Sequence, residues 1–211
     1  MPKTEVIVAA DADELAGRAA GLFISAAGTH VDQRGRFVVA LSGGSTPRGM
    51  HRLLAASPAL TEVPWEQTHL FWTDERSVPA SHPESNFGAA WRDFLHSLSL
   101  PHENIHSIKG GTPPEEAAEV YQLELRRFFQ LGEGEFPLFD LVFLGVGKDG
   151  HTASLFPDAG AAPDENRLAM AVKGGTPNVV RVTLTYPVLN RARQIVFLVV
   201  GREKAEMVEA L

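Results

Sequence analysis

Cysteine is absent from the 211-residue sequence. Its absence excludes disulfides, thiol nucleophiles and cysteine-based metal sites, and it fits a reducing compartment. The sequence also lacks an apolar run long enough to cross a membrane, and its first residues are not apolar enough for a signal peptide. We therefore expect a cytoplasmic protein with no membrane partner.

The sequence has fewer basic than acidic residues. The chain has 19 Lys and Arg against 26 Asp and Glu, a formal net charge of -7, and no run rich in basic residues. This balance argues against a nucleic-acid partner. An anionic small molecule is still compatible with it, because a local cluster of donors outweighs a diffuse negative charge.

Apolar runs typical of strands alternate with helical segments along the chain. Strands are expected at residues 5–10, 37–41, 69–72, 104–108, 141–146, 181–185 and 194–200, and helices at 11–27, 47–56, 85–98, 113–129 and 203–211. This alternation predicts an α/β fold with a doubly wound, mostly parallel sheet and helices on both faces. The length fits one domain covering residues 1–211.

The segment that follows the apolar run Leu141–Val146 carries the strongest chemical signal. Three glycines surround Asp149 and His151 there. Open α/β sheets bind ligands at the carboxyl ends of their strands, so we interpret this turn as the centre of an active site. An imidazole with an ordinary pKa near ~6.5 suits a general base, and Asp149, two residues before it, is a candidate for holding its ring in one tautomer, although the spacing does not give that geometry.

The glycines of this turn, Gly145, Gly147 and Gly150, also match the dinucleotide-binding pattern G-x-G-x-x-G. That pattern should open a long helix, whereas Pro157 interrupts the segment and residues 158–166 are loop-like. We therefore do not expect a nucleotide cofactor.

A second polar segment, Ser42–Pro47, follows the predicted strand at 37–41. Gly43 and Gly44 let the backbone approach a ligand closely, Ser45 and Thr46 add hydroxyl donors, and the following helix directs N–H groups at an anion. We expect Thr46 to be the N-cap and Pro47 the first helical residue. The segment fits a phosphate site and an ordinary tight turn equally well.

The third segment, Asp74–Arg76, follows the strand predicted at 69–72. Two carboxylates with a guanidinium can orient a sugar hydroxyl or stabilise developing negative charge. Taken alone, these residues are more typical of a solvated loop with an Asp–Arg pair.

Residues 102–106 match the zinc-protease pattern H-E-x-x-H. Pro101 precedes them and Gly110 follows closely, which favours a loop leading into a strand over the stable helix that a zinc site requires. We expect no metal.

Together these segments resemble the 6-phosphogluconolactonase family. The resemblance covers nearly the whole chain and is carried by LSGGSTPRGMHRLL (41–54), WTDERSVPASHPESN (72–86), LGVGKDGHTASLFP (144–157), RVTLTYPVLNRAR (181–193) and VGREKAEMV (200–208). It implies a fold shared with glucosamine-6-phosphate deaminases and ribose-5-phosphate isomerases. It also implies hydrolysis of 6-phosphoglucono-1,5-lactone in the pentose phosphate pathway, without a cofactor.

The resemblance assigns roles to individual residues. His151 matches the family's general base, and Asp149 lies beside it in the same motif. Arg76 matches an arginine that stabilises the oxyanion or holds substrate. Asp74, from the same segment as Arg76, is counted with these three as a catalytic residue. The residues implied to bind the phosphate are Gly43, Gly44, Ser45, Thr46, Arg181 and Lys204. The family continues beyond the last predicted helix with a strand and a helix, so the chain is expected either to be shortened at its C-terminus or to end its fold there.

Two other functions are left open. A glucosamine-6-phosphate deaminase would share the phosphate loop, but deaminases of that type carry a glutamate shortly after the histidine, and residues 152–157 contain no carboxylate. A non-catalytic sugar-phosphate sensor would normally add a DNA-binding segment, and no basic segment flanks the predicted domain. We expect a monomer or a weak homo-oligomer.

Overall fold

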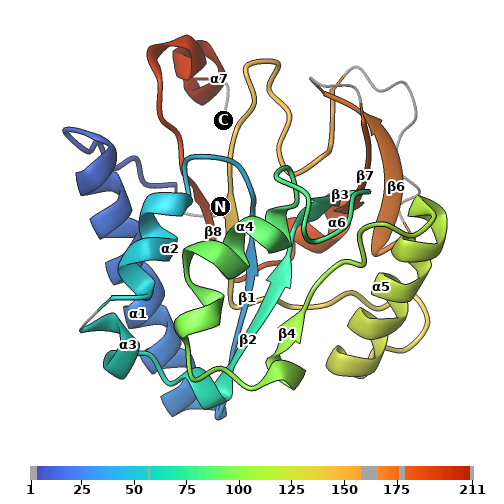
Figure 1. Cartoon of the computed structure of the whole chain (residues 1–211), viewed down its shortest axis with the longest axis horizontal. Coiled ribbons are helices and arrows are strands. Elements are labelled where there is room, and N and C mark those ends of the chain that lie inside the picture. Colours follow the sequence, from blue (N-terminus) through green and yellow to red (C-terminus); the bar gives the residue numbers. More distant parts are fainter. Residues whose placement is uncertain (1–3, 57, 158–165, 176–178, 210–211) are drawn as a thin grey trace.

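The computed structural model describes residues 4–56, 58–157, 166–175 and 179–209. Its central sheet has the strand order β4-β2-β1-β5-β8, and all four neighbouring pairs are parallel (Figure 1). These strands are β1 (Phe37–Leu41), β2 (Thr68–Trp72), β4 (Ile105–His106), β5 (Leu141–Leu144) and β8 (Ile195–Phe197). The predicted α/β fold with a mostly parallel sheet is confirmed.

Helices cover both faces of this sheet, as predicted. Side chains alternate between the faces of a strand. On one face, Phe23 of α1 (Ala12–Arg34) has its ring centroid 5.3 Å from that of Phe37 in β1. On the other face, Phe71 of β2 has its ring centroid 5.1 Å from that of Phe128 in α5 (Pro114–Phe129). The helices bury the apolar strands from both sides, which explains why β1 and β5 are apolar throughout.

The shorter helices join these layers. They are α2 (Arg48–Leu54), α3 (Ala59–Glu62), α4 (Asn86–Asp93), α6 (Tyr186–Leu189) and α7 (Ala205–Glu209), with 3₁₀ turns η1 (Trp65–Gln67), η2 (Leu95–Ser97), η3 (His102–Asn104) and η4 (Arg202–Lys204). Within the described ranges, no helix combines the length and the apolar character that a membrane crossing requires.

A second, antiparallel sheet lies beside the first (Figure 1). It has the order β3-β7-β6 and is formed by β3 (Asp74–Arg76), β6 (Ala169–Gly174) and β7 (Val179–Leu184). The strand predicted at 181–185 belongs to this sheet, not to the central one. The polar β3 was not predicted as a strand, because its pairing with β7 depends on residues more than 100 positions away.

Several strand predictions were wrong in part or in full: the strand expected at 104–108 is limited to β4, and the strand expected at 141–146 ends with β5 at Leu144. Residues 5–10 form no strand, and the side chains of Val6 and Val8 are 74% and 84% exposed. Their weak alternation found no neighbouring strand to pair with in the described structure. The strand expected at 194–200 shrinks to β8, which is only partly buried because it pairs on one side alone, with β5. Of the predicted loop at 158–166, residues 158–165 lie outside the described residues.

Candidate active site

The carboxyl ends of the central strands lead into one cavity of about 310 Å³. The loops that follow β1, β5 and β8 lie at the same end of the sheet, at the top of Figure 1. The lining includes every predicted site residue except Asp149, namely Gly43, Gly44, Ser45, Thr46, Asp74, Arg76, His151, Arg181 and Lys204. Because the strands are parallel, their carboxyl ends bring together segments that are far apart in the sequence.

The turn after β5 holds His151 against Asp149. The Nδ1 atom of His151 lies 2.5 Å from Oδ1 of Asp149, and the same oxygen accepts the backbone N–H of His151 at 3.3 Å. A Cβ atom on Gly147 would overlap both side chains, so glycine is required beneath this pair. Because the carboxylate occupies Nδ1, Nε2 is the ring nitrogen left for the cavity.

The Asp149 carboxylate stays ionised in this arrangement. Partial burial raises its pKa, but the hydrogen bonds from the ring and backbone of His151 outweigh burial, so the pKa of Asp149 lies below its ordinary value. An ionised Asp149 supports the tautomer of His151 with a proton on Nδ1.

The loop after β1 lies against the start of α4. A Cβ atom on Gly43 would overlap the side chain of Asn86, so only glycine permits this close approach. Gly44 has φ +92°, a conformation that favours glycine. In the sequence Asn86 is simply the second residue of the helix expected at 85–98, and no spacing indicates that it meets Gly43.

The predicted cap of α2 was wrong by one position. The helix begins at Arg48, Pro47 is the N-cap, and no side chain caps the helix. Pro47 has helical angles (φ -72°, ψ -11°) but precedes the first helical residue. Thr46, the predicted N-cap, and Pro47, the predicted first helical residue, therefore both lie in the turn before the helix. The Thr46 hydroxyl therefore makes no cap hydrogen bond and remains available to a ligand in the cavity.

Arg76 and Arg181 occupy directly opposite positions in the β3–β7 ladder. Both side chains line the cavity, and the Nε atoms of both are buried without a hydrogen-bond partner among the described residues. Burial, followed by repulsion from Arg76, lowers the pKa of Arg181. The charges of Asp74 and Glu84 oppose this shift and offset it only in part. A bound anion would therefore stabilise two like charges that are opposed in this way.

The predicted solvated loop at Asp74–Arg76 was wrong. Asp74 is 5% exposed and Glu75 is 2% exposed. Oδ2 of Asp74 accepts a hydrogen bond of 2.6 Å from the fully buried Ser154 hydroxyl. Glu75 accepts the backbone N–H groups of Asn86 and Phe87 at 2.8 Å each, so it fixes the start of α4 and does not face a ligand.

Arg76 is held in place by neighbouring oxygens. Its Nη1 donates to the Asn86 side-chain oxygen and, at 3.0 Å, to the carbonyl of Glu84. The amide nitrogen of Asn86 donates in turn to the Asp74 carbonyl at 2.9 Å. Asn86 therefore joins Arg76, Asp74 and the Gly43 loop, and it is the main site residue that sequence reasoning missed.

Lys204 reaches the cavity from η4, and Lys148 is a further lining cation without a predicted role. The cavity surface is therefore cationic although the chain is acidic. The H-E-x-x-H residues lie elsewhere: His102 is in η3 and His106 in β4, so they do not share a helix face. Across the described parts of the chain, no group of three or more potential metal ligands is found.

The chain is similar in sequence to known lactonases. A 6-phosphogluconolactonase of Synechocystis is 44% identical over 176 residues, covering 82% of this chain and 70% of the relative. A 6-phosphogluconolactonase of Nostoc is 40% identical over 204 residues, covering 96% of this chain and 82% of the relative.

The solved structures extend the comparison to the fold. The 6-phosphogluconolactonase of Trypanosoma brucei superposes with a TM-score of 0.87 at 27% identity, covering 98% of this chain and 86% of that one. A monomeric glucosamine-6-phosphate deaminase, 18% identical, shares the fold with a TM-score of 0.80 and covers 99% of this chain and 87% of that one. The model of the family "Glucosamine-6-phosphate isomerases/6-phosphogluconolactonase" matches residues 10–211, and the chain belongs to this family.

Proposed function

We propose that this chain hydrolyses 6-phospho-D-glucono-1,5-lactone to 6-phosphogluconate, a step of the oxidative pentose phosphate pathway. Its membership of the family and its identity to lactonases support this activity. The observation that carries the mechanism is that one cavity joins the Asp149–His151 pair to a cluster of cations and a glycine-rich loop.

In the proposed reaction His151 acts as the general base. Nε2 takes a proton from a water molecule while the water oxygen bonds to the lactone carbonyl carbon. The bond between that carbon and the ring oxygen then breaks, and His151 returns the proton to the leaving oxygen. Asp149 holds the ring through Nδ1 and stabilises the imidazolium that forms between the two proton transfers.

We assign the phosphate to the loop Gly43–Thr46, with Arg181 and Lys204 as its counter-charges. Loop hydroxyls and backbone N–H groups donate to phosphate oxygens, and two cations offset a dianion. Arg76, held by Asn86, lies beside Arg181 and supplies positive charge where the carbonyl oxygen becomes negative. A lactone is an activated ester, so positioned water, one base and this charge suffice.

The activity is tested by following acid release from the lactone with and without purified protein, because the lactone also hydrolyses slowly in water. We expect His151→Ala to lower kcat by the order of 10²–10⁴ with little change in KM. His96→Ala, which removes an exposed imidazole outside the cavity, is the control and should behave as the wild type. A large change in KM with unchanged kcat would contradict the role of His151.

The rival activity is tested on the same preparations. Residues 152–157 carry no carboxylate after the histidine, so we expect no ammonia release from glucosamine 6-phosphate. Robust ammonia release would overturn the proposal, and tight binding of 6-phosphogluconate without lactone turnover would favour a sensor.

The cytoplasmic location and the monomeric or weakly oligomeric state remain expectations. Cell fractionation tests the first, and sedimentation over a range of protein concentrations tests the second.

A further inference from the structure

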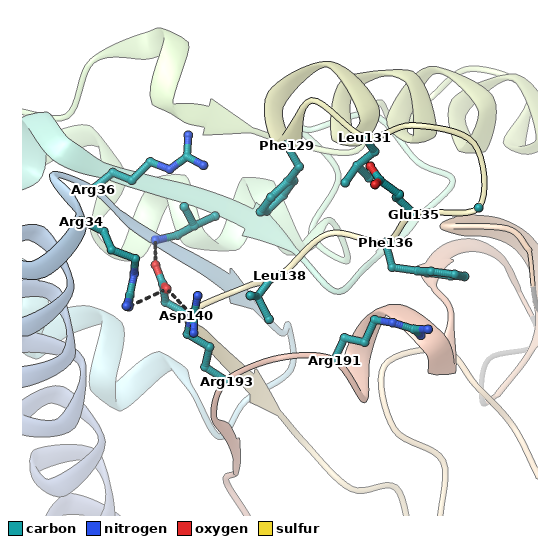
Figure 2. A pocket seen from close by; sticks show the side chains of 12 residues that line it. Arg34, Arg36, Phe129, Leu131, Glu135, Phe136, Leu138, Asp140, Arg191 and Arg193 are labelled. Carbon is teal, nitrogen blue, oxygen red and sulfur yellow. Dashed lines mark hydrogen bonds and ion pairs between the residues drawn. The ribbon is translucent and has the colours of Figure 1, made fainter.

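A second cavity, of about 510 Å³, lies at the amino ends of the central strands, opposite the active site. Figure 2 shows it from close by. Its lining includes Val38 near the start of β1, Asp140 immediately before β5, and Arg193 shortly before β8. Each of these strands ends at the active site. A five-residue strand spans about 17 Å at ~3.3 Å per residue, so the two cavities are separated by about the length of these strands.

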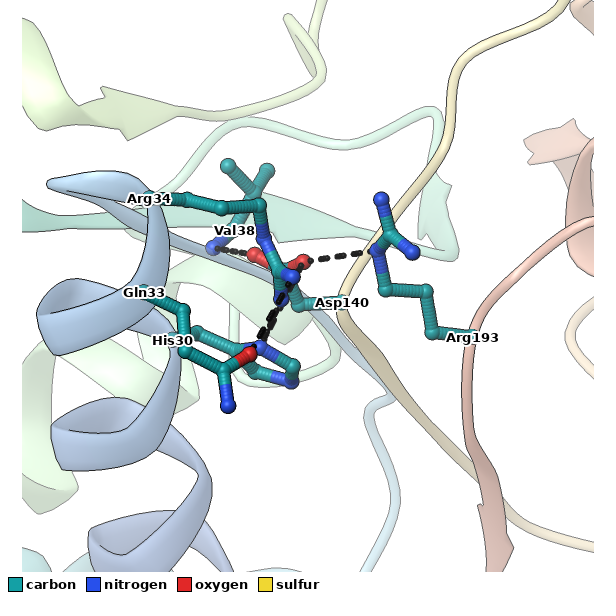
Figure 3. A network of polar contacts seen from close by, with 6 residues as sticks. All are labelled: His30, Gln33, Arg34, Val38, Asp140 and Arg193. Atoms are coloured by element: carbon teal, nitrogen blue, oxygen red, sulfur yellow. Dashed lines mark hydrogen bonds and ion pairs between the residues drawn. The ribbon is translucent and has the colours of Figure 1, made fainter.

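One buried carboxylate organises the cavity floor. Asp140 accepts the backbone N–H of Val38 at 2.9 Å and a hydrogen bond of 3.0 Å from Arg34, and Nε of Arg193 lies 3.3 Å from the same carboxylate (Figure 3). His30 lies 3.9 Å away. A single negative charge therefore serves two guanidinium groups, and its oxygens are already occupied.

Two further arginines line the cavity without an acidic partner. Arg36 lies over the ring of Phe128 at 5.1 Å and Arg191 over the ring of Phe136 at 4.2 Å. Arg191 also donates to the carbonyl of Pro187 at 3.1 Å, and neither arginine forms an ion pair with any residue that the structure describes. The aromatic rings fix the guanidinium positions and leave most of their N–H groups free.

The charge of the cavity is opposite to that of the protein. Four guanidinium groups face two carboxylates, Asp140 and Glu135, within a chain whose formal net charge is -7. Glu135 is itself engaged, because it accepts the backbone N–H of Gly132 at 2.7 Å. The remaining excess of two positive charges favours a ligand with several negative charges.

The rest of the lining is apolar. Phe129, Leu131, Phe136 and Leu138 form one wall of the cavity (Figure 2), and the side chain of Leu138 is 42% exposed. An apolar wall beside polar groups is the usual composition of small-molecule sites, which have volumes of about 300–1,000 Å³. A ligand that fits both features joins a multiply charged group to a planar ring.

We propose that this cavity is a second binding site, separate from the active site, for a ligand of the nucleoside diphosphate class. Arg36 and Arg191, with the remaining donors of Arg193, bind the diphosphate, whereas both Nη atoms of Arg34 are engaged by Gln33, His30 and Asp140. The wall of Phe129, Leu131, Phe136 and Leu138 covers the base. The bidentate geometry of guanidinium with phosphate oxygens suits arginine better than lysine at these positions.

The test is calorimetric titration with ADP, compared with adenosine and with inorganic pyrophosphate. We expect ADP to bind more tightly than either fragment, with an affinity that falls as salt rises. The double variant Arg36→Gln/Arg191→Gln should weaken ADP binding at least tenfold. Arg52→Gln/Arg92→Gln, which removes the same charge from exposed positions outside both cavities, should not weaken it.

Two further variants separate this site from the active site. Lys204→Gln removes a cation from the active-site cavity and should leave ADP binding unchanged, whereas Leu138→Glu introduces a carboxylate at the exposed wall and should abolish it. The double variant Arg36→Gln/Arg191→Gln and the variant Leu138→Glu should both keep normal lactone hydrolysis, which also shows that they are folded. Unchanged ADP affinity in the folded double variant, or its loss in Lys204→Gln alone, would overturn the proposal.

Discussion

Arg76 and Arg181 face each other across an antiparallel ladder, and the Nε atoms of both are buried without a partner in the described structure. Two adjacent strands thus direct two positive charges into one cavity. Without a bound anion this arrangement does not stabilise the folded protein, because like charges opposite one another repel. The arrangement is favourable once an anion lies between or beside the two guanidinium groups. We therefore regard the pair as preorganised to bind the sugar phosphate.

The first prediction concerns this pair. We expect Arg181→Gln to raise KM by about ten- to a hundredfold and to change kcat much less, because the lost contact is made in ground and transition states alike. Inorganic phosphate should raise the melting temperature of the wild type and should do so less in the variant. Arg92→Gln serves as the control with an exposed arginine. A loss confined to kcat would assign Arg181 to the chemical step instead.

The second prediction concerns the Asp149 carboxylate. Asp149→Asn removes the charge that holds the His151 ring, so we expect kcat to fall by about 10²-fold with KM nearly unchanged. The pKa of Asp149 is lowered in the folded protein, so its charge is present above the ordinary carboxyl range and is lost only below that range. Activity measured at pH 5 should therefore still depend on Asp149. Asp32→Asn, at an exposed position in α1, is the control.

The third prediction concerns the contact between Gly43 and Asn86. In Gly43→Ala the new methyl group meets the Asn86 side chain, which holds Arg76, so we expect kcat/KM to fall at least tenfold. Gly21→Ala provides a matched control, because nothing lies within 4 Å of the added atom in α1. That control should keep full activity and gain about 0.5–1 kcal/mol of unfolding free energy. Equal activity of both variants would show that the loop adjusts freely.

The sequence was sufficient to locate the central strands β1 and β5, because both are apolar on both faces. The run at 37–41 coincides with β1, and the Asp11 side chain caps α1 through the N–H groups of Asp13 and Glu14, at the start of the helix expected at 11–27. The glycine and polar residues that follow β1 and β5 also predicted which loops form the cavity. These signals are local, so a single sequence reveals them.

The second sheet and the inner contacts of the site could not be predicted in this way. β3 is a polar tripeptide that becomes a strand only by pairing with β7, and β6 carries mixed residues that no periodicity marks. Asn86 meets Gly43 and Arg76 through the packing of α4, and Ser154 meets Asp74 across 80 positions of sequence. Such contacts depend on the assembled fold, and the residue types alone do not indicate them.

The last prediction concerns His51, a buried histidine of α2 that is 4% exposed. Its ring centroid lies 4.6 Å from that of Phe94, and both ring nitrogens lack a hydrogen-bond partner among the described residues. Burial lowers the pKa of His51 to about 4, whereas the charge of Asp93 opposes this shift and that of Arg48 adds to it. The folded protein therefore holds this imidazole in its neutral form.

The sign of the pH dependence follows from this shift. Between pH 6.5 and about 4 the unfolded chain binds a proton at His51 that the folded protein does not bind, so stability is lost as the pH falls through this window. His51 alone should lower the unfolding free energy by about 2 kcal/mol between pH 7 and pH 5. Burial also lowers the pKa values of His69, to about 4, and His106, so both histidines act in the same direction.

Replacement of His51 by a ring that cannot be protonated should remove its share of this dependence. We expect His51→Phe to retain the stacking on Phe94 and to reduce the loss of unfolding free energy between pH 7 and pH 5, as measured by urea denaturation at both values. His51 does not line the active-site cavity, so lactone hydrolysis at pH 7 should be unchanged. The exposed His96→Phe is the control and should keep the wild-type slope. An equal loss of stability in wild type and His51→Phe would show that His51 is already protonated in the folded state or remains accessible to solvent.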